Sequence, residues 1–204
     1  TSGIMRPGWP GLVCGLFCTV VAPGYSQETT QPASQPSGPP AALAGFADEG
    51  KFRLYVNDDA VATIEFTWAE DGHFENTQVI STAGQTVTRR LNITPDDAGI
   101  WKRITLDTAK GPATLERVGD VARRTVGEAV TNIPLRAGAV LFENTSPALT
   151  SMAVRAYDRQ KGGKQTLPVF FVPSGVADAT LEALTPETRV VGSGVMAYSR
   201  YTFG

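Results

Sequence analysis

The sequence has few of the residues that carry most protein chemistry. It has two cysteines and one histidine among 204 residues. Cys14 and Cys18 both lie in an apolar run near the N-terminus. One cysteine pair with a single distant histidine cannot supply the four ligands of a closed zinc site. We therefore expect no metal centre and no cofactor, and no disulfide outside that run.

The chain also has no excess of basic over acidic residues. The chain has 18 basic and 20 acidic residues, a net charge of −2. A protein that binds nucleic acid neutralises phosphates with a surplus of lysine and arginine. No such surplus exists here, so no nucleic-acid partner is expected.

Catalytic motifs are missing as well: there is no Gly-x-Ser-x-Gly elbow and no glycine-rich phosphate loop. His73 follows Asp71-Gly72 at a turn, which favours an exposed histidine over a triad member, since a triad needs a serine and an aspartate against it. Asp58-Asp59 and Asp96-Asp97 also fall in turn clusters. Calcium binding or glycosidase chemistry would require further ligands or a set separation. We predict no catalytic residue and favour a segment that is not itself catalytic. An enzyme that uses the barrel interior is a further alternative, which would require several polar side chains pointing inward.

Residues 1–26 are predicted to be a leader and signal peptide. Met5-Arg6 precedes an apolar run at residues 12–22, and small residues follow before Gln27. These are the parts of an export signal, and the run is too short to span a bilayer comfortably. We expect a bacterial protein in the periplasm or outside the cell, with no stable membrane span after cleavage. A buried N-terminal strand or helix is the alternative.

Residues 27–45 are rich in proline, serine, glutamine and threonine and predict a disordered linker, because they lack apolar surface to offset the entropy of ordering. A single β-rich domain is expected over residues 46–204. The aromatic segment at 198–203 is an unusual place for a terminus, which predicts that further sequence follows.

Short alternating segments dominate that domain. Ala62, Ile64, Phe66 and Trp68 fall on one face of a strand, the period-2 pattern of a half-buried sheet. Similar patterns predict strands at residues 52–56, 62–68, 73–81, 87–93, 100–106, 113–118, 121–131, 165–172, 176–184, 188–192 and 195–203.

Two of these strands carry specific burial predictions. The strand at 87–93 should bury Val87, Leu91 and Ile93. The strand at 100–106 should bury Ile104 and place Trp101 on the opposite face. With turns this short and no βαβ alternation, the fold is predicted to be mostly β, a curved antiparallel meander that forms a half-barrel or barrel.

One amphipathic helix interrupts the strands. Ser146-Pro147 is a helix start, and residues 149, 152, 153, 156 and 157 form one apolar face. Lys161-Gly162-Gly163 is a predicted stop after about four turns. We expect the helix to pack on the concave side of the meander or across its mouth. Core packing is favoured over ligand contact for Met152 and Tyr157.

Residues 52–59, the helix at 147–157 and the segment 163–169 together resemble the lipoprotein-carrier-like half-barrel proteins of bacterial envelopes, and in particular the periplasmic DUF3108 family. This resemblance implies a free-standing periplasmic carrier that holds a lipid or other apolar ligand in its concave face. The residues expected to line such a site are Leu54, Ile64, Phe66, Leu91, Ile104 and Met152.

A second resemblance implies a different function. Residues 141–149 and 154–159 are similar to the non-catalytic N-terminal region of some secreted bacterial hydrolases, in which an α/β-hydrolase or peptidase domain follows. On this view the chain is an accessory β-domain of a larger exported hydrolase, and its partner is that C-terminal domain. We prefer this function and keep the carrier as the alternative.

Overall fold

The computed structural model describes residues 42–45, 47–82 and 84–204. The predicted signal peptide and the predicted linker up to residue 41 lie outside the described residues. Residues 42–45, which the sequence assigns to the linker, pack on the domain: Leu43 is buried, and its backbone N–H donates to the Gly99 carbonyl over 2.7 Å. Among the described residues, no helix combines the length and apolar character of a membrane span.

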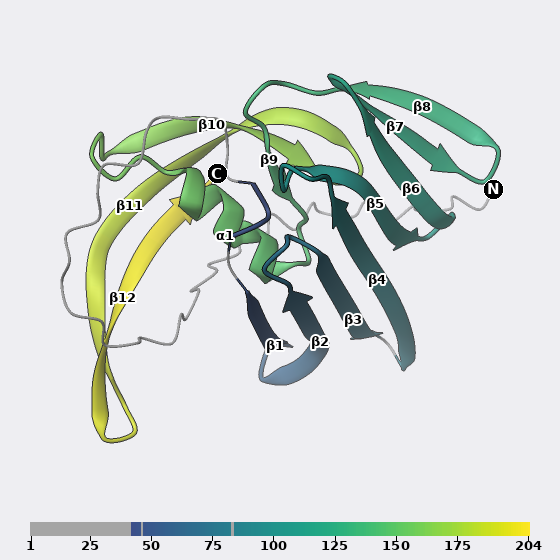
Figure 1. Ribbon diagram of the computed structural model, residues 1–204. Helices are drawn as coiled ribbons and strands as arrows, with labels where there is room; N and C mark the ends of the chain where they lie inside the picture. The colour runs from purple at the N-terminus through teal and green to yellow at the C-terminus, as the bar shows by residue number, and fades with distance from the viewer. Residues whose placement is uncertain (1–41, 46, 83) are drawn as a thin grey trace, which may run out of the picture.

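The larger sheet, sheet A, is an antiparallel meander of eight strands in chain order (Figure 1). Its curvature and connectivity confirm the predicted mostly-β fold. Its strands are β1 (Asp48–Val56), β2 (Asp59–Trp68), β3 (Phe74–Thr82), β4 (Gln85–Pro95), β5 (Trp101–Thr108), β6 (Gly111–Val118), β7 (Val121–Val126) and β8 (Ala129–Pro134).

The smaller sheet, sheet B, has four strands in the order β12-β11-β10-β9. Its elements are β9 (Val140–Phe142), β10 (Lys164–Phe171), β11 (Gly175–Val191) and β12 (Gly194–Phe203), with helix α1 (Pro147–Ala156) between β9 and β10. The pairing of β9 with β10 is parallel. The β9–α1–β10 unit is therefore a single βαβ connection in an otherwise antiparallel fold, and the sequence pattern does not indicate it because β9 is too short to show a period.

Apolar side chains on the inner face of sheet A align into cross-strand rows. Trp68, Phe74, Ile93, Ile104 and Leu115 are successive register partners across β2 to β6, and each is at most 2% exposed. Paired side chains of this kind stabilise a sheet, because their neighbours on the same face are fixed by the ladder. This row is the centre of a core that sheet B and α1 complete.

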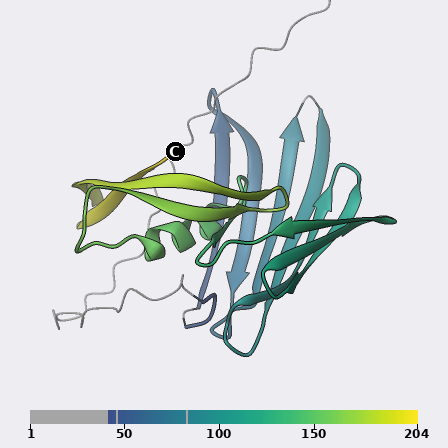
Figure 2. The ribbon, with the colours of Figure 1, turned by 90° about the horizontal axis from the view of Figure 1, so that it is seen from above.

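Helix α1 runs along the inner side of sheet B, in the space that the two sheets enclose (Figures 1 and 2). Its buried residues are Pro147, Ala148, Leu149, Met152 and Ala153, which confirms an amphipathic helix on the concave side. The helix has 10 residues, so the predicted four turns are too many. It ends at Ala156 because the Asp158 N–H donates to Gln165 Oε1 instead of continuing the helical ladder.

Three strand predictions need correction. Residues 121–131 form the first strand and part of the second strand of a hairpin, β7 and β8, which turns at Gly127 with φ 57°. The strands predicted at 176–184 and 188–192 are one continuous strand, β11, which ends at Val191, because a bulge near Pro186 interrupts the pattern without ending the strand. Val87 is 52% exposed, since its pair with Ile80 lies near the β3–β4 turn, beyond the buried rows of Leu91 and Ile93.

Charge is unevenly distributed along sheet A. Residues 42–100, which include β1 to β4, carry ten acidic and four basic residues, a net charge of −6. Residues 101–136, which include β5 to β8, carry seven basic and four acidic residues, a net charge of +3. One sheet therefore has an acidic half and a basic half.

Candidate functional site

A pocket of about 90 Å³ lies where β5 and β6 of sheet A meet β9, β10 and α1. We call it the Trp101 pocket. An aromatic pair, two arginines and several aliphatic side chains line it, and those used below are Trp101, Phe170, Arg117, Arg136, Ala139 and Met152.

Trp101 reaches this pocket through a bulge. Leu106 and Ile104 point inward, and strict alternation would bring residue 102 inward next. The register shifts, however, between the pairs Thr94–Arg103 and Pro95–Trp101, so that one additional residue of β5 is accommodated. Such a bulge reverses the alternation beyond it. Trp101 is therefore 5% exposed on the inner face, and the prediction that it lies on the opposite face is wrong.

The floor of the pocket joins the two sheets. The rings of Trp101 on β5 and Phe170 on β10 are stacked, with centroids 5.6 Å apart and planes 14° from parallel. Phe170 is 1% exposed. This stacking makes the aromatic part of the pocket lining rigid, and little of either ring is open to solvent.

Two guanidinium groups belong to the same pocket. The Arg117 Cζ atom lies 5.9 Å from the centre of the Trp101 ring, within the range of a cation–π contact. Its Nε–H donates to the Gly119 carbonyl over 3.4 Å. Arg136 forms an ion pair with Asp178, with Nη1 and Oδ1 2.7 Å apart and both side chains about half exposed. The lining thus combines an aromatic floor with positive charge.

A second polar cluster lies at the junction of β3 and the loop before α1. The Glu143 carboxylate is buried and accepts the Thr145 backbone N–H over 2.9 Å. The Thr145 hydroxyl lies 2.8 Å from Glu143 Oε2 and 2.7 Å from Gln78 Oε1. Nearby in the chain, the Asn76 amide and the Ser146 hydroxyl are buried without a hydrogen-bond partner within the described chain. These contacts hold the loop against β3.

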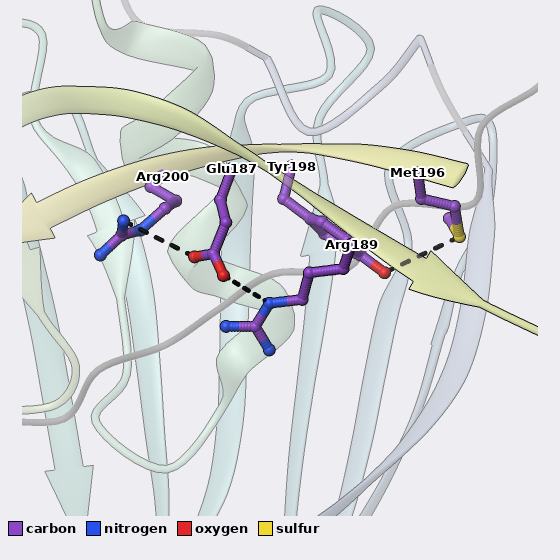
Figure 3. Close-up of polar contacts among 5 residues, drawn as sticks. All are labelled: Glu187, Arg189, Met196, Tyr198 and Arg200. Carbon is purple, nitrogen blue, oxygen red and sulfur yellow. Dashed lines mark hydrogen bonds and ion pairs between the residues drawn. The ribbon is translucent and has the colours of Figure 1, made fainter.

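A third group of polar contacts lies on the β11–β12 hairpin (Figure 3). Glu187 accepts from Arg189 Nε over 2.8 Å and lies 3.6 Å from Arg200 Nη1. The hydrogen bond from Arg189 lowers the pKa of Glu187, and the charges of both arginines add to this effect. Beyond this cluster, the register partners Val190 and Val195 are 77% and 70% exposed.

The six residues predicted to line a ligand cavity lie on the inner faces. Phe66, Leu91, Ile104 and Met152 belong to the packed core, Ile64 is 1% exposed, and Leu54 is half-buried. Met152 is the one member of this set that lines the Trp101 pocket. Sequence reasoning missed Trp101, Arg117, Arg136 and Phe170, because only the packing of the sheets brings them together.

The turn residues behave as their sequences predict. His73 is exposed, and its Nδ1 lies 3.0 Å from Asp71 Oδ2. The backbone N–H of His73 also donates to Asp71, and this bond is the main cause of a lowered pKa for that carboxyl group. Asp96 accepts the backbone N–H groups of Ala98 and Ile100. Across residues 42–204, apart from 46 and 83, no three His, Cys, Asp or Glu side chains are placed to hold a metal ion.

Comparison with known proteins finds no matching family model, no matching curated protein and no matching solved structure.

Proposed function

We propose that this domain is a non-catalytic accessory domain of a larger exported bacterial protein, and that it holds a neighbouring polypeptide by one side chain in the Trp101 pocket. The observation that carries the proposal is the size of that pocket together with its aromatic floor. Sites for whole small molecules are typically about 300–1,000 Å³. A pocket of about 90 Å³ fits a group the size of a single side chain.

The filled concave face also supports this function over a lipid carrier. An acyl chain in that face would need the space that α1 occupies. Leu149 and Ala153 are each fully buried there, and Met152 is 3% exposed. Displacing several packed side chains would cost a large share of the 5–15 kcal/mol that typically stabilises a domain.

The neighbouring polypeptide is, in this proposal, the hydrolase or peptidase domain that the sequence resemblance implies. The segment with that resemblance, residues 141–149, contributes Leu141 to the pocket. Its position at the pocket wall makes a contact between the two domains at this point physically reasonable.

Titration of the full chain separates the two functions. Tryptophan fluorescence is followed while either a capped neutral pentapeptide with a central phenylalanine or palmitate is added. We expect the peptide to change the tryptophan fluorescence, to which Trp101 contributes from the pocket lining, and palmitate to have no effect. The variant Ala139→Phe places a ring into the pocket and should abolish peptide binding, whereas Ala137→Phe changes an exposed neighbour outside the pocket.

A different pattern would reject the proposal. If palmitate binds more tightly than the peptide and Ala139→Phe leaves both affinities unchanged, the domain carries apolar ligands elsewhere and the pocket is not its binding site.

A further inference from the structure

The charge around the Trp101 pocket identifies the chemistry of its partner. Arg117 lies on β6 and Arg136 in the loop between β8 and β9, yet both line the same small pocket beside an aromatic floor. We infer that the polypeptide held there presents an aromatic or branched apolar side chain flanked by aspartate or glutamate. This inference rests on the proposed function, and it adds the partner's charge.

Arg117 is oriented for this contact. Its guanidinium lies over the Trp101 ring, and its Nε–H is held by the Gly119 carbonyl. The two terminal nitrogens carry the other four N–H groups of the side chain. A planar guanidinium fixed in this way matches a carboxylate in a two-point contact. An apolar side chain on the floor would bring a flanking carboxylate to this group.

Arg136 is held in place by a contact that a ligand can replace. Its ion pair with Asp178 joins two side chains that are each more than 50% exposed. Exposed pairs contribute little net stability, since both ions remain well hydrated when separated. A partner carboxylate could therefore take the position of Asp178 at small cost.

The surroundings of the pocket have the same sign. Residues 101–136 carry a net charge of +3, whereas residues 42–100 carry −6. Complementary potentials steer partners and reject those of like charge. An acidic segment is attracted to the half of sheet A that contains the pocket, and a basic segment to the other half.

Three capped pentapeptides test this inference on the full chain. Each has a central phenylalanine, flanked on both sides by aspartate, asparagine or lysine. We expect the aspartate peptide to bind about three- to tenfold more tightly than the asparagine peptide, as for partly exposed ion pairs, and the lysine peptide to bind most weakly. Arg117→Gln and Arg136→Gln should each reduce this preference. Arg53→Gln removes the same charge from exposed β1, outside the pocket, and should leave it unchanged.

The outcomes separate the two proposals. Equal binding of all three peptides, abolished by Ala139→Phe, would overturn the acidic partner and leave the accessory function standing. If no peptide changes the tryptophan fluorescence, both proposals fail. Tighter binding of palmitate than of any peptide would also overturn both, in favour of an apolar carrier.

Discussion

At the residue scale, Trp101 has two structural tasks. Its ring packs against Phe170 of the other sheet, and the same ring supports Arg117 at the pocket. A residue that joins the core and lines a site fixes the site relative to the core. The position of the pocket's positive charge therefore depends on core packing rather than on a loop.

Asp178 is predicted to compete with an acidic ligand for Arg136. Replacing it, Asp178→Asn, removes a carboxylate 2.7 Å from Arg136 Nη1. We expect the affinity for the aspartate-flanked peptide to rise about two- to threefold, because the guanidinium no longer has to exchange partners. Fluorescence titration measures the change. An unchanged or lower affinity would show that Asp178 does not compete for the site.

The side chain of Ser146, the N-cap residue of α1, is predicted not to stabilise the helix. Removing a serine cap usually costs about 0.5–2 kcal/mol. The Ser146 side chain makes no capping bond, and its hydroxyl is buried without a partner within the described chain. The variant Ser146→Ala should therefore leave the free energy of unfolding unchanged or raise it by up to about 1 kcal/mol in urea denaturation.

Thr145→Ala is the matched control for that experiment. It removes a hydroxyl within hydrogen-bonding distance of Glu143 and Gln78, and should cost about 1–3 kcal/mol. A loss at Ser146 as large as the loss at Thr145 would contradict the prediction.

Sequence reasoning succeeds at single residues where a strand is regular. Ala62, Ile64, Phe66 and Trp68 are all buried, as their spacing predicts. It fails at Trp101, because the bulge that turns this side chain inward depends on how β5 pairs with β4. A period-2 pattern gives no information about an additional residue that β5 accommodates at a bulge.

At the element scale, the β11–β12 hairpin differs from the rest of the molecule. Figure 1 shows its closed end projecting away from the rest of the molecule. The bulge between Leu184 and Glu187 separates this outer part from the part that packs on the core. The outer part exposes Val190 and Val195 and is held by the ion pairs of Glu187.

Acid is therefore predicted to loosen the outer hairpin first. The pKa of Glu187 is lowered by its bond to Arg189, so its stabilising contribution is present above the ordinary glutamate value and is lost as pH falls through the lower, folded value. We expect NMR signals of residues 187–200 to shift below about pH 4.5, before the core signals change. In Glu187→Gln this early step should be absent. If the early shift of the hairpin signals persists in Glu187→Gln, a group other than Glu187 is responsible for it.

Some elements are visible in the sequence and others are not. The helix start at Ser146-Pro147 is correct because local residues define it. The helix end is missed because Gln165, on the next strand, binds the Asp158 N–H. The sequence predicts two strands in place of β11 because a proline such as Pro186 usually ends a strand, whereas here the bulge accommodates it.

At the scale of the whole molecule, one core spans both sheets. Residues from each of β2 to β11 and from α1 belong to a single apolar cluster. The pairing of sheet A with sheet B could not be predicted from the chain, because periodicity identifies a buried face without saying what covers it. The Trp101 pocket exists only in that pairing, so it was invisible to sequence reasoning.

A shared core predicts cooperative unfolding. Phe170→Ala removes a ring that is 1% exposed and should cost about 3–5 kcal/mol. Because the sheets share the core, we expect the thermal transitions seen by tryptophan fluorescence and by far-UV circular dichroism to shift together and stay coincident. Val195→Ala, at a site 70% exposed, is the control and should change little. Two separated transitions would mean that the sheets unfold independently.

The acidic and basic halves of sheet A also give the molecule an electric dipole. The chain has a net charge of only −2, yet its two charged regions of −6 and +3 lie side by side in one sheet. Near a charged surface such a molecule rotates before it makes contact, with the β5–β8 half turned towards negative charge. At 0.1 M salt, screening limits this alignment to about 10 Å. The rate of encounter with an acidic surface will thus depend on ionic strength, even for a protein close to neutral overall.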